Sequence, residues 1–282
     1  MIENFALFFK INQLQLIQQW RFMNSFNGNI EILILLVGGT ISGMISGLLG
    51  IGGAIVLIPF LLFILPLAQG PHLTPFVATQ ISLFQVALSG IVGFLSHRIN
   101  ADLPTRKIFL WGISSLIGGG FGGLISHDLR GRTILILYAF EVAVAVGLLL
   151  FGEKISSFKG EKPAKPLKEA AIMSSIGLVS GILGIGGGFL YYPVITGLLG
   201  YHSSVAVGCG LALMIPMAIA GSITKTITAG SIPVEGIPVI FGAILGAWMG
   251  AKLHYRLPKH AVKTGQLILL LATFIRILWA LY

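Results

Sequence analysis

Two long stretches without formal charge limit what this chain can fold into. The segments Ile32–His97 and Ala170–Thr224 contain no Asp, Glu, Lys or Arg, although about 20 apolar residues are enough to span a bilayer. Soluble domains carry charge on about a quarter of their residues, whereas only 10% of this chain is charged and its mean hydropathy is +0.95. Each stretch therefore predicts several membrane-spanning helices, in an all-α integral membrane protein.

Apolar runs and turn signals arrange the expected helices in two series of the same order. Each series begins with a long element, near 31–66 and near 169–199, and continues with three helices of ordinary length. Those helices are expected near 75–97, 104–125 and 133–151, and again near 203–228, 233–253 and 261–282. We therefore divide the chain into a first transmembrane repeat at 30–151, a charged linker at 152–168 and a second transmembrane repeat at 169–282.

The first 29 residues precede both repeats. Glu3, Lys10 and Arg21 interrupt the apolar pieces of this segment, and no small-residue cleavage site follows them, which argues against a secretory signal. We expect residues 1–29 to form an interfacial helix. If Met23 is the true start of the protein, residues 1–22 are a non-native extension instead.

One glycine-rich motif occurs twice, in the middle of each long element. The sequence "GLLGIGGAIVLIP" at Gly47–Pro59 matches "GILGIGGGFLYYP" at Gly181–Pro193. Three further pairs follow in the same order: Val77–Gln80 with Val207–Gly210, Asn100–Pro104 with Ala229–Pro233, and Gly118–Gly123 with Gly246–Ala251. Internal duplication is a recurrent design of secondary transporters, whose substrate site lies at the repeat interface near the membrane midplane.

Each long element is too long for one straight helix. As a single helix it would measure roughly 45 to 55 Å, against a hydrocarbon core of about 30 Å. Consecutive glycines are poor helix formers and permit positive φ, so we expect the breaks at Gly50–Gly53 and Gly184–Gly188. Broken backbone is tolerated in a bilayer only where protein buries it or where it lines a cavity.

The N–H groups that open a helix after a break have no intrahelical partner and attract anions. We expect Ile51–Ala54 and Ile185–Gly188 to present such donors toward one another. The predicted anion site comprises Gly50, Ile51, Gly52, Gly53, Ala54, Thr79, Gln80, Gly184, Ile185, Gly186, Gly187, Gly188, Cys209 and Gly210. Gln80 is included because its repeat partner is Gly210. Close helix packing is the alternative role for small residues in membranes, and we favour it for "GGGFGG" at Gly118–Gly123.

The distribution of Lys and Arg bears on whether the long elements cross the membrane or fold back. If they fold back, the loop at Arg98–Lys107, the linker and the loop at Lys252–Lys263 share one side and hold 12 of the 18 Lys and Arg residues. If each crosses once, the richer side holds 11. The positive-inside rule mildly favours folding back, which makes the two repeats inverted.

Ionisable residues inside the spans are costly and often functional. Glu141 and Arg276 fall near the middle of the last helix of each repeat, and we expect them to form a structural ion pair. The functional alternative makes Glu141 a proton relay and Arg276 an anion ligand. Lys225, like His97 and Arg98, lies near a helix end; we expect it to snorkel to the interface, although a cation at a vestibule would also attract anions.

The chain shows no catalytic or metal-binding pattern. It lacks HExxH, G-x-S-x-G and P-loop motifs, and "GIGGG" has no strand–helix context for a dinucleotide. We therefore expect no enzymatic activity, cofactor or metal. The net charge of +9 is spread between the spans, which argues against nucleic acid as a partner. Cys209 is the single cysteine and forms no intramolecular disulfide.

The paired glycine motifs, "VATQIS" at Val77–Ser82, "GAILGAWMGAKL" at Gly242–Leu253 and the final apolar helix together resemble the sulfite exporter TauE/SafE family of membrane transporters. The resemblance covers about Ile32–Tyr282. It implies about eight membrane segments in two related halves and the transport of sulfur-containing anions such as sulfite, sulfoacetate or related sulfonates. Family members often carry a Thr-Ser pair after the glycine motif; this chain has Thr79-Gln80 and Cys209-Gly210, which alters specificity if that pair touches substrate.

Taken together, these features predict a secondary transporter that moves small sulfur-containing anions by alternating access. An anion channel and a noncatalytic membrane scaffold are the alternatives. The expected location is the cell membrane, as a multi-pass protein of the bacterial inner membrane. The expected partners are the anion and the bilayer, and the sequence leaves a homo-oligomer open.

Overall fold

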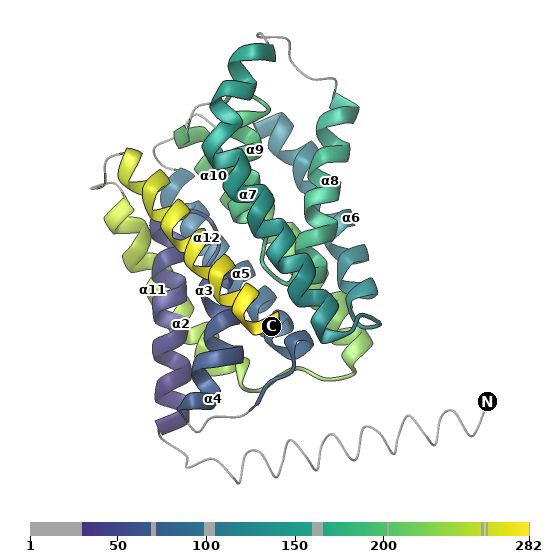
Figure 1. Ribbon diagram of the computed structural model, residues 1–282, viewed down its shortest axis with the longest axis vertical. Helices are drawn as coiled ribbons and strands as arrows, with labels where there is room; N and C mark the ends of the chain where they lie inside the picture. The colour runs from purple at the N-terminus through teal and green to yellow at the C-terminus, as the bar shows by residue number, and fades with distance from the viewer. Residues whose placement is uncertain are drawn as a thin grey trace, which may run out of the picture.

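The computed structural model of the chain describes residues 30–68, 72–98, 105–159, 166–201, 203–254, 257 and 259–281 (Figure 1). The helix expected at 1–29 lies outside these residues. Every regular element within the described ranges is helical, which confirms the expected all-α class.

Among the described residues, eight helices are long and apolar enough to cross a membrane, so the chain is a multi-pass membrane protein. They are α2 (Ile30–Leu49), α5 (Pro75–Arg98), α6 (Thr105–Ser126), α7 (Gly131–Lys159), α8 (Pro166–Leu183), α10 (Ser203–Ala229), α11 (Gly236–His254) and α12 (Lys259–Leu281). Because α7 continues to Lys159 and α8 begins at Pro166, these two helices take up most of the expected linker.

Shorter helical pieces follow α2 and α8. After α2 come α3 (Ala54–Pro59), the π-helical segment η1 (Phe60–Ile64) and α4 (Leu65–Leu67), which are continuous with one another; after α8 comes α9 (Gly188–Gly197). Pro59 lacks a backbone N–H, and the hydrogen-bond pattern changes to the wider π form directly after it.

Both long elements fold back on themselves. Along α2 and its return segment the contacts run in opposite directions: Gly53 lies against Ser42, and Phe60 lies against Gly38. Leu65 then shares a buried cluster with Leu35. Figure 1 shows α4 beside the end of the bundle where α2 begins. In the second half Gly187 lies against Ser180 and Ile176 of α8, so this chain segment also reverses. The structure therefore has the folded-back arrangement that the charge distribution mildly favoured.

Small residues bring the helices together. On α2, Gly39, Gly43 and Gly47 lie directly against the α11 backbone, and a Cβ at any of them would overlap it. Gly118 and Gly122 of α6 meet the α8 backbone in the same way, while Gly119 and Gly123 meet α10. Membrane helices associate through such close backbone approach because lipid offers no hydrophobic gain on association. The packing role expected for Gly118–Gly123 is thus confirmed.

The two halves are interleaved. Helix α2 packs on α11, and α8 packs on α6; α5 packs on α11, and α10 packs on α6; α3 packs on α12, and α9 packs on α7. Each broken element is thus held by helices of the other half. This reciprocity is the arrangement that two related halves would produce, and it places the two breaks in the interior of the bundle.

Candidate functional site

The helices break where the glycine motifs predict. Helix α2 ends at Leu49 and α3 begins at Ala54, while α8 ends at Leu183 and α9 begins at Gly188. The backbone reverses through glycines with positive φ, among them Gly52 at +80° and Gly186 at +86°. L side chains rarely adopt that conformation, so these positions require glycine.

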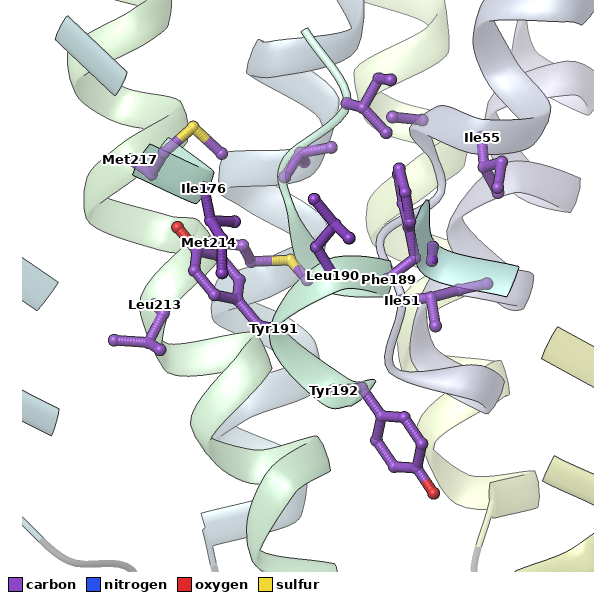
Figure 2. Close-up of a cluster of buried hydrophobic side chains, with 14 of the residues drawn as sticks. Ile51, Ile55, Ile176, Phe189, Leu190, Tyr191, Tyr192, Leu213, Met214 and Met217 are labelled. Atoms are coloured by element: carbon purple, nitrogen blue, oxygen red, sulfur yellow. The ribbon is translucent and has the colours of Figure 1, made fainter. Parts of the chain in front are cut away.

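The two breaks touch one another. A Cβ on Gly188 would lie 2.6 Å from the backbone oxygen of Ile51, and a Cβ on Gly52 would lie 3.4 Å from the backbone oxygen of Ile185. The Met214 side chain lies beside both glycines, with its methyl carbon 3.6 Å from the Cβ position of Gly52. Figure 2 shows Ile51, Phe189, Leu190 and Met214 gathered at this meeting point. The breaks therefore face each other as expected, and apolar side chains close the contact between them.

Backbone donors are open at both breaks. In the ranges that the structure describes, the N–H groups of Gly52, Gly53 and Ala54 donate no hydrogen bond, and neither do those of Gly186, Gly187 and Gly188. The expectation was wrong for Ile185, whose N–H donates to the Ser180 oxygen at 3.2 Å. That bond forms because the chain turns tightly after α8 and brings the Ile185 nitrogen over the last turn of the helix.

Three of the other predicted positions join the breaks, and one does not. Gly184 lies directly on Thr79, and a Cβ on Gly210 would lie 4.0 Å from the backbone oxygen of Gly50 and 3.9 Å from that of Gly188. Cys209 is buried in the same apolar core. Gln80 points elsewhere: its amide nitrogen donates to Thr226 Oγ1 at 3.2 Å and to the Ser231 oxygen at 2.9 Å, tying α5 to the end of α10.

Lys225 does not snorkel to the interface. Its side chain is fully buried, and its ammonium donates to Thr79 Oγ1 at 2.7 Å and to the Ile182 oxygen at 2.9 Å. The Phe76 ring lies 5.3 Å from the nitrogen. The Lys225 side chain points inward because Ile182 belongs to the last turn of α8. In that turn the carbonyls lack intrahelical partners, and the helix dipole favours a cation.

Glu141 and Arg276 do not form the expected ion pair. Glu141 is 2% exposed and accepts a hydrogen bond from Ser180 Oγ at 2.8 Å. The Arg276 guanidinium instead lies over the Phe63 ring at 4.0 Å and near the Trp279 ring at 5.3 Å. Aromatic faces attract cations, and they hold Arg276 away from the interior where Glu141 lies.

Sequence reasoning missed several polar residues at the breaks. Ser180 contacts Glu141, and Ser82 Oγ donates to the Gly184 oxygen at 2.7 Å. A signal for Ser180 was available, since Ser46 and Ser180 immediately precede the matched motifs in the two halves. Tyr191, whose aromatic carbon Cε2 lies 2.9 Å from the Cβ position of Gly187, looked like an ordinary core residue.

A second buried carboxylate lies away from the breaks. Glu169 accepts hydrogen bonds from Lys107 Nζ at 3.0 Å and Trp111 Nε1 at 3.1 Å. Because both oxygens have partners and one partner is a cation, this carboxylate is well satisfied. Within the described part of the chain, no group of three His, Cys, Asp or Glu side chains gathers as a metal site.

Known proteins resemble this chain over most of its length. The family model described as "Sulfite exporter TauE/SafE" matches residues 35–277. A probable membrane transporter protein of Xylella fastidiosa strain Temecula1 is 27% identical over 260 residues, which cover 89% of this chain and 96% of the relative.

Two further relatives come from other organisms. The probable membrane transporter protein YunE of Bacillus subtilis is 24% identical, covering 86% of this chain and 96% of the relative. The probable membrane transporter protein MJ0441 of Methanocaldococcus jannaschii is 27% identical, covering 80% and 88%. No solved structure matches the chain. The family match extends from α2 to α12 and includes both breaks, and the chain therefore belongs to the sulfite exporter TauE/SafE family.

Proposed function

We propose that this protein is a secondary transporter that moves small sulfur-containing anions, such as sulfite or related organosulfonates, across the membrane by alternating access. The family and the relatives named as membrane transporters support the transport role. The observation that supports an anionic substrate is the environment of Lys225. This residue carries a fully buried ammonium beside the second break, and no carboxylate pairs with it among the described residues.

A buried cation without a counter-charge is an unfavourable arrangement. Neutral oxygens from Thr79 and Ile182 satisfy two of its three donors, but they do not neutralise its charge. A bound anion would do so. Thr79 also touches Gly184, so the cation and the open N–H groups of Gly186–Gly188 belong to one region that suits a small oxyanion.

The direct contact between the breaks supports alternating access as the mode of transport. Backbone and apolar side chains fill the space where the breaks meet, including Ile51, Ile185 and Met214. An anion reaches the donors there only after the breaks separate. The positive-φ glycines at both breaks supply hinges for that separation, and each half of the bundle holds the broken element of the other.

The proposal is tested first by anion binding. Purified protein in detergent is heated in the presence of sulfite, sulfate, thiosulfate, sulfoacetate, taurine or chloride, and the unfolding midpoint is recorded. We expect a sulfur oxyanion to raise the midpoint of the wild type, because a ligand stabilises the state that binds it. We expect Lys225→Met to lose that shift.

Lys252→Met is the matched control, since Lys252 is an exposed lysine that lies over the Trp248 ring at 3.5 Å. The control keeps the shift. A folded wild type that responds to none of the anions would contradict the proposal and favour the scaffold alternative. A transporter and a channel are then separated in liposomes, because a transporter shows saturable flux and counterflow, whereas a channel shows neither.

A further inference from the structure

Unsatisfied polar atoms gather behind the second break. Five buried side-chain atoms have no hydrogen-bond partner within the described residues. Three of them lie on α7, α9 and α6, respectively: Glu141 Oε2, Tyr191 Oη and Ser115 Oγ. Buried polar atoms are nearly always paired, so a group of unpaired ones indicates a bound species that is not part of the protein chain.

These residues form one cluster around Gly187. Ser180 Oγ and the edge of the Tyr191 ring both lie 2.9 Å from the Cβ position of this glycine, so a side chain here would displace them. Ser180 Oγ donates to Glu141 Oε1. Tyr191 Oη approaches Ser115 Oγ without meeting hydrogen-bond geometry. Ser180 therefore connects the Glu141 carboxyl to the backbone of the break through a single hydrogen bond.

Helix α7 also reaches the first break. Tyr138, one turn before Glu141, donates through its hydroxyl to the Ile55 oxygen at 3.3 Å, at the start of α3. Thr273 of α12 approaches the same oxygen at 3.5 Å. A change at Glu141 can thus act on both breaks, since its own helix contacts each of them.

Charged and titratable groups near Glu141 are few. Tyr138 on its own helix and Tyr191 on α9 interact electrostatically with it. On α8, Glu169 is held by Lys107, and on α12, Arg276 lies over Phe63. Residues 75–96 of α5 contain no titratable side chain, and Lys168 of α8 and Lys263 of α12 lie near the N-terminal ends of their helices.

No cation pairs with Glu141 in the described residues, and Ser180 is its one hydrogen-bond donor there. An ionised carboxylate in a low-dielectric interior needs donors at both oxygens or a counter-ion. This environment offers neither at Oε2, whereas a neutral carboxylic acid carries a much smaller desolvation cost.

We propose that Glu141 is the proton-binding site that couples proton movement to the transport cycle of this protein. In the closed arrangement, with the breaks in contact, the carboxyl holds a proton. When the breaks separate and water reaches the cluster, the proton leaves. The coupling to transport rests on the proposed function, whereas the assignment of Glu141 as a proton site does not.

Coupling follows from the hydrogen bonds at Ser180. Its hydroxyl donates to Glu141, and its backbone oxygen accepts from Ile185 in the break. Loss of the proton leaves a carboxylate that is better satisfied by water than by the closed cluster, so deprotonation favours movement of Ser180 and opening of the break. By linkage, opening favours deprotonation to the same extent.

The proton site is tested without any substrate. Infrared spectra of the purified protein in lipid report the carbonyl band of a protonated, buried carboxylic acid. We expect this band at neutral pH in the wild type, its loss in Glu141→Gln, and its retention in Glu169→Gln, where the replaced carboxylate is paired with Lys107. A wild-type spectrum without the band, or a band that Glu141→Gln leaves unchanged, would overturn the assignment.

The coupling is tested in liposomes with sulfite as the probe. Two rates are measured: uptake driven by an imposed pH gradient, and exchange of labelled sulfite at equilibrium, which requires no net proton movement. In Glu141→Gln we expect gradient-driven uptake to fall by about tenfold or more, while exchange continues near the wild-type rate. Glu169→Gln keeps both rates.

The outcomes separate this inference from the proposed function. If wild-type protein neither binds nor moves any of the sulfur anions, the proposed function fails, and the infrared band still decides the proton site. If Glu141→Gln keeps gradient-driven uptake, the coupling role is wrong. If a folded, monodisperse Glu141→Gln protein loses exchange as well as uptake, Glu141 acts on the substrate itself, and the coupling role is also wrong.

Discussion

The polar residues that matter most in this bundle lie at the ends of broken helices. The C-terminal turns of α2 and α8 carry carbonyl groups without intrahelical partners, and these turns are buried. Lys225 donates to the Ile182 oxygen, and at the corresponding position of the first half His254 donates to the Leu48 oxygen at 2.6 Å. Gln266 donates to the neighbouring Leu49 oxygen at 2.8 Å. Each broken end is thus completed by side chains from elsewhere in the bundle.

Glycine substitutions at the breaks should separate backbone strain from packing. Gly52→Ala adds a side chain at φ +80° with its nearest neighbour at 3.4 Å, so we expect the cost of the left-handed conformation, about 1 to 2 kcal/mol. Gly186→Ala also drives its Cβ into Val86, and we expect a larger loss, about 2 to 4 kcal/mol. The measurement is the thermal unfolding midpoint in detergent.

The control is Gly147→Ala in the interior of α7. No atom lies within 4 Å of its Cβ position, and alanine is the better helix former by about 1 kcal/mol. We expect its midpoint to equal or exceed that of the wild type. Equal midpoints for Gly186→Ala and Gly147→Ala would show that the break does not require the backbone conformation described above.

At the scale of elements, the close packing of α2 with α11 and of α8 with α6 gives a prediction about both halves. Gly43→Ala places a methyl group on the Ala243 backbone, and Gly177→Ala places one 2.5 Å from the Ser115 backbone oxygen. Overpacking of this kind costs about 1 to 3 kcal/mol. We expect both variants to unfold at lower temperature than the wild type, and by similar amounts, because in each the added methyl group meets the backbone of the facing helix.

Val37→Leu is the control for this comparison, since Val37 lies on the exposed face of α2 and is 45% accessible. It enlarges a side chain without touching α11, so its midpoint stays at the wild-type value. A normal midpoint for either glycine variant would mean that the corresponding helix pair can move apart at little cost.

Much of this architecture could be predicted from the sequence, because hydropathy indicates which segments lie in the membrane and glycine runs indicate where a helix breaks. The spans and the break positions follow from such signals, whereas the folding-back was favoured only mildly, by the distribution of Lys and Arg. The surroundings of individual side chains did not follow. The position of Lys225 near a helix end is compatible with snorkelling. The rotation of α10 about its own axis, however, turns the side chain toward Ile182. In the same way, Glu141 and Arg276 share a depth, but the aromatic rings of Phe63 and Trp279 hold the guanidinium away.

At the scale of the whole molecule, the folded-back elements decide which loops share a side. Starting from Ile30, the chain runs along α2, returns through α3–α4 and then alternates direction through α5, α6 and α7, and the second half repeats this pattern in the opposite sense. The turn between α6 and α7 therefore lies at one end of the bundle, and the start of α8 lies at the other. The end with the start of α8 also carries the loops around Arg98–Lys107 and Lys252–Lys263. Together with residues 152–168, these loops hold 12 of the 18 Lys and Arg residues. From the positive-inside rule we expect this end to face the cytoplasm.

That orientation can be measured with single cysteines. Cys209 is buried and is replaced by serine first. Asp128→Cys marks the turn between α6 and α7, where the native side chain is 90% exposed, and Lys168→Cys marks the exposed start of α8. With a membrane-impermeant maleimide on intact cells, we expect Asp128→Cys to react and Lys168→Cys to react only after the membrane is opened.

A third cysteine is needed to test the folding-back itself. If the long elements crossed the membrane once, Asp128→Cys and Lys168→Cys would still lie on opposite sides, because α7 separates them in either case. Ile30→Cys, at the exposed start of α2, reacts from the same side as Asp128→Cys if the element folds back, because the return through α3–α4 brings the chain back to the end where α2 begins, and α5 and α6 then leave that end and come back to it. If the element crossed once, Ile30→Cys would lie on the side of Lys168→Cys. Reaction from that side would contradict the folded-back fold, and with it the meeting of the two breaks in the membrane interior on which the anion site depends.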